Sequence, residues 1–261
     1  MLRFLSDIQY VQPFGNGPEW LRHPAHLPDC RCDALPRGVK YAGQTEALRR
    51  MFRDGMAMAV KNIVFDIGGV LADFNVNGFL SGKGFDAPMI KRILKASVMT
   101  PYWGQFERGE ITEEETLQGF ATVDPEIADE LRVAFSSVEG MLTIRDYAIP
   151  LVKSLKSAGY NVFYLSNYSE KAYNECGESL AFMPYMDGGL VSFRVGKTKP
   201  DPAMYRQFLA EFGLDAGDCV FVDDTPENVV AARELGFLGV EFESYDGLVA
   251  KLREFGVELP D

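Results

Sequence analysis

Short apolar runs that end in polar residues alternate with amphipathic stretches along most of the chain after residue 58. The runs are VKNIVFDIG (60–68), YNVFYLSN (160–167), DGGLVSFRVG (187–196), DCVFVDD (218–224) and FLGVEFE (237–243). A continuous apolar run of this length is typical of a strand that is buried on both faces. The pattern therefore predicts several strands of a covered sheet.

Amphipathic stretches with a helical period separate these runs, and two of them open on a helix-start signal. Asp201-Pro202 and Thr225-Pro226 each pair an N-cap residue with proline at the first helical position. Strands that alternate with helices favour a parallel sheet. We expect an α/β fold: a Rossmann-like parallel sheet with helices on both faces.

The segment between Phe74 and Tyr147 has no strand pattern and shows the spacing of amphipathic helices. We predict an α/β core formed by residues 58–74 and 147–261, interrupted by an inserted helical cap at residues 75–146. A cap over the strand ends would exclude water from them. Residues 1–57 lack regular periodicity, and we expect an irregular or disordered extension there.

Composition narrows the class of partner. The net charge of −12 argues against a nucleic-acid-binding or anionic-membrane-binding surface. The chain has no run of about 18 apolar residues, so no membrane span is expected. Its four cysteines are too few and too scattered for a disulfide framework. We expect a cytoplasmic protein, monomeric or homodimeric, that acts on a small molecule.

Polar residues follow three of the predicted strands at the point where each strand ends. They are Asp66, the pair Ser166 and Asn167, and the pair Asp223 and Asp224. Ligands of parallel sheets bind beyond the carboxyl ends of the strands. Each group alone could simply cap the helix that follows. Acids that converge from different strands repel one another, and a divalent cation relieves that repulsion.

Four motifs in chain order carry a family resemblance: VFDIGGVL, VFYLSN, GKTKPDPAMY and VFVDDTPENVVAAR. From about residue 60 to 258 the chain resembles the haloacid dehalogenase superfamily of aspartate-nucleophile phosphatases. Because it carries the segments DIGGV, FERGEIT and KPDP, the chain is similar to the glucose-1-phosphate phosphatase branch of this superfamily and to the phosphatase half of soluble epoxide hydrolases.

The resemblance implies a Mg²⁺-dependent phosphatase that hydrolyses small phosphorylated metabolites, such as sugar phosphates, through an aspartyl-phosphate. It also implies a role for each of several residues. The catalytic residues would be Asp66 as nucleophile and Lys199 as phosphate partner. The Mg²⁺ ligands would be Asp66, the Gly68 carbonyl and the pair Asp223 and Asp224, with Asp224 the direct ligand of that pair. The substrate contacts would be Ser166, Asn167, the Gly69 amide and Arg108.

Gly68 departs from the superfamily pattern, because most of its phosphatases carry a second aspartate at that position. A general acid of this kind contributes about 10²–10⁴-fold to the rate. Three possibilities stay open: a phosphatase whose leaving group needs little protonation, a metal-independent 2-haloacid dehalogenase, or a catalytically weak metabolite-binding protein. In the first of these, Asp73 is either a loop residue or a substitute acid. The paired acids Asp223 and Asp224 favour the first.

Overall fold

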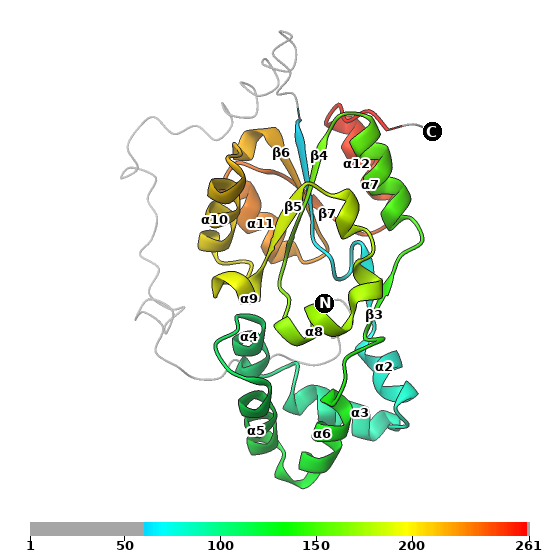
Figure 1. Ribbon diagram of the computed structural model, residues 1–261, viewed down its shortest axis with the longest axis vertical. Coiled ribbons are helices and arrows are strands. Elements are labelled where there is room, and N and C mark those ends of the chain that lie inside the picture. The colour runs from blue at the N-terminus through cyan, green and yellow to red at the C-terminus, as the bar shows by residue number, and fades with distance from the viewer. Residues whose placement is uncertain (1–59, 260–261) are drawn as a thin grey trace, which may run out of the picture. The chain divides into compact units, whose positions relative to one another are not determined.

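The computed structural model describes residues 60–259, and its centre is a five-stranded sheet in which every neighbouring pair is parallel (Figure 1). The strand order is β5-β4-β1-β6-β7. The strands are β1 (Asn62–Phe65), β4 (Asn161–Ser166), β5 (Gly188–Val191), β6 (Cys219–Asp223) and β7 (Leu238–Glu241). Because β1 lies at the middle of this order, its carboxyl end opens between those of β4 and β6.

Alternate residues of the central strand pack into two separate apolar layers. Ile63 and Phe65 belong to one buried cluster, whereas Val64 belongs to the other. Successive side chains of a strand point to opposite faces, so both faces of the sheet are covered. This explains why β1 is a continuous apolar run rather than an alternating one.

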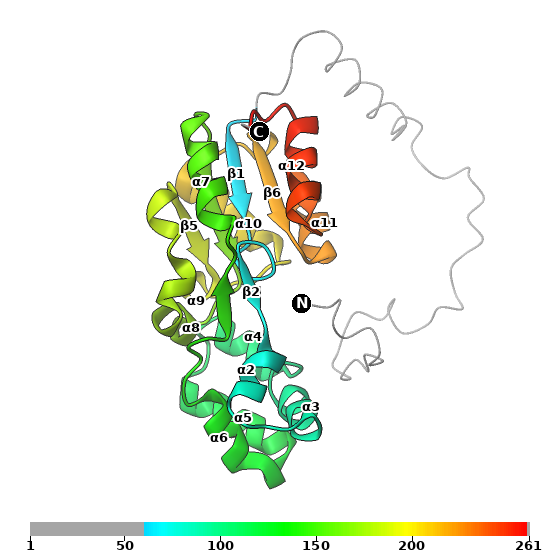
Figure 2. The same ribbon diagram turned by 90° about the vertical axis from the view of Figure 1, so that its right-hand side faces the viewer.

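Two helices cover each face of the sheet. Leu151 of α7 (Ala148–Ser157) and Leu248 of α12 (Tyr245–Glu254) pack in the first layer. Phe208 of α10 (Pro202–Phe212) and Ala231 of α11 (Pro226–Glu234) pack in the second. Figures 1 and 2 show the two pairs on either side of the strands.

A helical insert, which comprises α2 to α6, leaves the core after β1 and returns before α7. A two-stranded antiparallel ribbon of β2 (Ala72–Phe74) and β3 (Leu142–Ile144) connects it to the core. Its helices are α2 (Val76–Gly82), α3 (Ala87–Ala96), α4 (Pro101–Glu107), α5 (Glu113–Val123), η3 (Pro125–Ile127) and α6 (Ala128–Phe135). Both views place the insert beyond the carboxyl end of β1 (Figures 1 and 2).

Short helices complete the part of the chain that is described. They are α8 (Glu170–Glu175), η4 (Gly177–Leu180), η5 (Met183–Tyr185), α9 (Ser192–Val195) and η6 (Ala216–Asp218). Helix α9 corrects one expectation, because the run predicted as a strand over 187–196 ends at Val191. Gly196 closes α9 with a φ of 64°, a left-handed conformation that favours glycine.

The predicted fold class, a parallel sheet with helices on both faces, is confirmed. Both strands of the ribbon were missed, β2 after the first predicted strand and β3 in the stretch expected to be entirely helical, because three residues are too short a pattern to recognise. The predicted extension at 1–57 lies outside the described residues. Over residues 60–259 no helix has both the length and the apolar character needed to cross a membrane.

Candidate active site

Asp66 lies directly after β1, where the central strand ends, and only 8% of its surface is exposed. Its backbone N–H donates to the carbonyl of Val222 in β6, at 2.8 Å. One carboxylate oxygen, Oδ1, accepts the N–H of Ile67 at 2.7 Å. The sheet therefore fixes both the backbone and the carboxylate of Asp66 at its carboxyl edge.

A buried lysine connects Asp66 to the neighbouring strand. The Lys199 ammonium lies 2.8 Å from Oδ1 of Asp66 and 2.6 Å from Oδ2 of Asp223. Asn167 holds the backbone of this lysine from both sides: its Oδ1 accepts the Lys199 N–H at 2.8 Å, and its Nδ2 donates to the Lys199 carbonyl at 3.0 Å. Residues from β1, β6, the end of β4 and the loop before α10 thus meet at one point.

Asp223 is fully buried, and its carboxylate accepts four hydrogen bonds from three donor groups. Oδ1 accepts the Thr225 N–H at 2.9 Å, Oδ2 accepts Lys199, and the Asn228 amide donates to both oxygens. A buried carboxylate is stable only when it is paired in this way. Asp223 is therefore better suited to position Lys199 than to offer a free oxygen to a metal ion.

Burial and charge act against each other in this cluster. Desolvation raises the pKa of Asp66 to about 6, in spite of the nearby Lys199 ammonium. Burial alone would lower the pKa of Lys199, but the attraction of Asp223 and Asp66 outweighs it and raises that pKa. Lys199 therefore stays charged, and because it is shared between two acids it does not fully neutralise Asp66.

The acids fit a divalent cation. Asp66, Asp223 and Asp224 each offer a carboxylate oxygen, and these atoms lie within 4.8 Å of one another. The carbonyl of Gly68 accepts no backbone hydrogen bond from the residues that the structure describes, so it can serve as a further oxygen ligand. Mg²⁺ takes oxygen ligands and usually keeps several waters. Asp66, Gly68 and Asp224 are the residues best suited to hold it.

Gly69 allows Asp224 to reach this position. Its φ is +77°, and an added Cβ would lie 2.1 Å from Oδ2 of Asp224. Its amide, predicted to hold the phosphoryl group, donates instead to the carbonyl of Ala72 at 2.8 Å. The predicted role is therefore corrected: Gly69 provides space for the Asp224 carboxylate, and its N–H is already used to turn the chain into β2.

We expect Gly69→Ala to destabilise the protein more than Gly84→Ala does. Both positions have left-handed backbones, which costs an alanine about 1–2 kcal/mol, but only at Gly69 does the new methyl group meet another side chain. Urea unfolding of the two variants would measure the difference, and magnesium titration by calorimetry should show weaker binding for Gly69→Ala alone. Equal destabilisation with equal magnesium affinity would contradict this account of Gly69.

Three other predicted substrate residues differ in what they contact. The Ser166 side chain is buried at the end of β4 and makes no hydrogen bond with residues 60–259, so its hydroxyl is available to a ligand. Both polar atoms of Asn167 are already bonded to Lys199, so Asn167 acts through that lysine. Arg108 forms a bidentate pair with Glu110, at 2.7 and 2.8 Å, instead of pointing a free guanidinium at the acids.

Gly68 is not required by backbone sterics. Its φ lies outside the left-handed region, and an added Cβ would have its nearest contact 3.9 Å away, at Cβ of Phe74. The possible substitute acid, Asp73, pairs with Arg145 at 2.7 Å, and its side chain is 58% exposed. These contacts fit the structural interpretation of Asp73 and do not fit a proton donor.

The sequence analysis missed two residues whose electrostatic surroundings include Asp66. Glu107, at the end of α4, accepts the indole N–H of Trp103 at 2.9 Å. Tyr168 has a buried hydroxyl without a hydrogen-bond partner among residues 60–259, and burial followed by the nearby Cys176 and Asp66 raises its pKa. Tyr168 directly follows the SN pair of the second motif, whereas Glu107 stands in FERGEIT, beside the arginine that was singled out.

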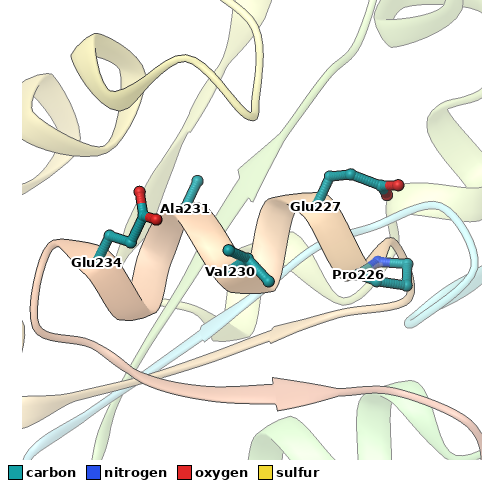
Figure 3. Close-up of a pocket in the computed structure, with 5 residues that line it drawn as sticks. All are labelled: Pro226, Glu227, Val230, Ala231 and Glu234. Carbon is teal, nitrogen blue, oxygen red and sulfur yellow. The ribbon is translucent and has the colours of Figure 1, made fainter. Parts of the chain in front are cut away.

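A hollow on the outer side of α11 is separate from this site. Pro226, Glu227, Val230, Ala231 and Glu234 line it (Figure 3), and none of the clustered acids is among them. Asn228 of the same helix donates instead to Asp223. Because the hollow contains none of the clustered acids, we assign the chemistry to the acids at the sheet edge.

The motifs that build this site also occur in a known protein family. Residues 60–236 match the model of the haloacid dehalogenase-like hydrolases, which is more than half of the chain. The chain belongs to that family. The haloacid dehalogenase-like match covers the Asp66, Ser166, Lys199 and Asp223-Asp224 motifs in their predicted order, and the family prediction is confirmed.

Two curated relatives of this chain carry hydrolase or phosphatase names. The chain is 32% identical to flavin mononucleotide hydrolase 1 of Arabidopsis thaliana over 162 residues, which cover 60% of this chain and 63% of that protein. It is 26% identical to a sesquiterpene phosphatase of Aspergillus oryzae over 199 residues, 76% of this chain and 98% of that one. These names agree with the predicted class, a phosphoric monoester hydrolase.

A solved haloacid dehalogenase-family enzyme from Bacteroides thetaiotaomicron shares the fold. It has a TM-score of 0.56 at 21% identity, and the match covers 73% of this chain and 99% of the other. That enzyme was crystallised in complex with magnesium and inorganic phosphate. At this identity the likeness supports the fold alone.

Proposed function

We propose that this protein is a Mg²⁺-dependent phosphatase that hydrolyses small phosphorylated metabolites through an aspartyl-phosphate. The observation that carries the proposal is Lys199, a buried ammonium held between Asp66 and Asp223, with a carboxylate oxygen of Asp224 within 4.8 Å of oxygens of both acids. Burying these charges costs stability, so their presence at one point indicates that they perform a function. Phosphoryl transfer needs this combination of a carboxylate, a fixed cation and oxygen ligands for a metal.

Each group has one task in this proposal. Asp66 attacks phosphorus, and Lys199 balances the negative charge of the phosphoryl oxygens. The Ser166 hydroxyl donates to one of those oxygens. A bound Mg²⁺ would neutralise charge between the nucleophile and the phosphate. Asn167 and Asp223 keep Lys199 in place.

The alternative reaction, 2-haloacid dehalogenation, also uses an aspartate nucleophile but attacks carbon. It gives no task to a carboxylate such as Asp224 aimed at a metal position. The close approach of Asp224, Asp223 and Asp66, within 4.8 Å, therefore favours phosphoryl transfer. The third possibility, a binding protein without turnover, leaves the nucleophilic geometry of Asp66 without a purpose.

The test is a substrate screen of the purified full-length protein with MgCl₂ and with EDTA. The panel contains glucose 1-phosphate, glucose 6-phosphate, ribitol 5-phosphate, flavin mononucleotide and farnesyl monophosphate, and phosphate release is measured. Metal-dependent release supports the proposal. Chloride release from 2-chloropropionate in EDTA would favour the dehalogenase, and no release in either assay would favour a binding protein.

The cytoplasmic location and the monomeric or homodimeric state stay predictions. So does the division into a core and a cap at residues 75–146, which we propose as the segment that sets specificity. Functional residues lie disproportionately on loops that a rigid scaffold positions. The end of α4 and the loop after it contact the core at α9, directly after β5.

A further inference from the structure

The end of α4 is hydrogen-bonded to the core at the carboxyl end of β5. The buried hydroxyl of Ser192, at the start of α9, donates to the Glu107 carbonyl at 2.5 Å. The same hydroxyl accepts the Tyr168 N–H at 2.8 Å. Gly109 follows with a φ of +66°, and a Cβ there would lie 3.1 Å from the carbonyl of Phe193. Glu107 therefore has a fixed place at the contact between insert and core.

The Glu107 side chain is also held, and it has no cationic partner. Its Oε1 accepts the indole N–H of Trp103, 2.9 Å away. Among residues 60–259 no lysine or arginine forms an ion pair with it, since Arg108 is engaged by Glu110. A partly buried carboxylate without a counter-ion is costly. Such a group is retained for a purpose or is protonated.

The charges around Glu107 come from both sides of the contact. The pKa of Glu107 is raised to about 7, and burial is the largest cause. The nearby Asp66 carboxylate contributes to this rise, whereas the Trp103 hydrogen bond, Lys199 and Arg108 act in the opposite direction. The charged groups of the adjoining helices have other partners: Glu113 pairs with Lys171, Glu114 with Arg132, and Arg194 of α9 lies over Tyr173 and Phe193.

We propose that Glu107 of the helical insert is the general acid and base of this phosphatase, in place of the side chain that Gly68 lacks. The inference rests on the proposed function. The helix of Glu107 contacts the core at the carboxyl ends of β4 and β5, through Ser192 and Tyr168, so in this assignment the acid reaches the substrate from the insert, whereas Asp66 reaches it from β1. With Glu107 as the general acid, the substrates are not restricted to anomeric phosphates and include phosphate esters of ordinary alcohols.

Protons and bonds balance in both steps of this reaction. In the first step Asp66 bonds to phosphorus, the ester P–O bond breaks, and Glu107 gives its proton to the departing alkoxide, which leaves as an alcohol. In the second step the Glu107 carboxylate takes a proton from water, and the water oxygen bonds to phosphorus. The P–O bond to Asp66 breaks, and inorganic phosphate and both original side chains are restored.

The kinetic test compares two leaving groups in Glu107→Gln, with Glu114→Gln as the matched control in the insert, because Glu114 pairs with Arg132 at the surface. The esters are 4-nitrophenyl phosphate, whose phenolate leaves without protonation, and whichever primary-alcohol phosphate of the screen is hydrolysed fastest. We expect kcat/KM for the alkyl ester to fall about 10²-fold in Glu107→Gln, with little change for the nitrophenyl ester. Glu114→Gln should behave as wild type with both esters.

The pH profile supplies a readout that a structural role would not move. In the wild type, kcat/KM for the alkyl ester should decline above about pH 7 relative to the nitrophenyl ester, because the acid form of Glu107 is lost; Glu107→Gln should abolish that difference. Equal losses with both esters, or no loss with the alkyl ester, would overturn the proposal. The wild-type profiles alone decide if Glu107→Gln does not fold.

A metal-free measurement tests the group itself. Because Trp103 donates to Glu107, its fluorescence should change as Glu107 ionises near neutral pH, and this transition should be missing in Glu107→Gln. The same transition in both proteins would overturn the assignment. Failure of the phosphatase proposal looks different: the wild type would then release no phosphate from either ester.

Discussion

Replacing Asp66 by asparagine is expected to lower metal-dependent phosphate release by at least about 10³-fold, the scale at which removal of a nucleophile stops an enzyme. Asparagine keeps the size of the side chain, but its amide cannot form the acyl-phosphate bond. The measurement is kcat with the best substrate of the panel, in saturating magnesium. Circular dichroism should show an unchanged fold, since Asn can still accept the Ile67 N–H and the Lys199 ammonium.

Asp218→Asn is the matched control for this substitution. Asp218 stands at the amino end of β6, at the opposite edge of the sheet from Asp223, and pairs with Lys61 at the surface. Its loss should leave the rate within about twofold, because an exposed pair contributes little. Full activity of Asp66→Asn with magnesium would exclude the proposed nucleophile, and a large loss in Asp218→Asn would show that the assay reports general stability instead.

Replacing Lys199 by methionine should have the largest effect on stability. The substitution leaves the buried carboxylates of Asp66 and Asp223 without their shared cation, and breaking a buried pair in this way costs about 3–5 kcal/mol. The free energy of unfolding in urea measures it. Catalysis should also fall by about 10²-fold or more, because charge stabilisation of the phosphoryl group is lost.

Two conditions should reduce this destabilisation. Added magnesium should restore part of it, because a bound cation replaces the missing positive charge. Lower pH should do the same: burial already raises the pKa of Asp66 and Lys199 counteracts it, so without Lys199 that pKa rises further and the folded state binds more protons than the unfolded one. Stability of Lys199→Met relative to wild type should then improve as the pH falls from about 8 to about 5.

Lys197→Met is the control for the loss of a lysine. Lys197 is two residues away and is partly exposed, and its ammonium bonds to Gln207 at 2.9 Å. We expect its loss to change stability by less than about 1 kcal/mol. If Lys199→Met were as mild as Lys197→Met, the two acids would not depend on that lysine, and the proposed arrangement of the site would be wrong.

Local pattern predicted the elements that carry the site. The apolar runs located β1, β4, β6 and β7, and polar residues at three of their ends marked the edge at which a parallel sheet binds ligands. The prediction was weakest for pieces too short to show a period. Ribbon strand β3 and the turn of helix at Ser192–Val195 were both missed for that reason.

Tertiary contacts changed the tasks of several predicted residues. Gly69 and Asn167 lie beside the site, but their hydrogen bonds are made to Ala72 and to Lys199, respectively. A spacing along the chain shows which residues come near one another and not which donor finds which acceptor. Glu107 was overlooked because its position in an amphipathic helix is indistinguishable from that of a surface acid.

The amino-acid sequence by itself determined the α/β class, the family and the edge of the sheet where Asp66, Lys199, Asp223 and Asp224 meet, because strand period and motif order are local properties. Only the tertiary structure decided how charge is distributed there: Asp223 saturated by donors, Lys199 shared between two acids, and Glu107 brought over from the insert. Those features depend on contacts between segments far apart in the chain, where burial sets the energy of each charge.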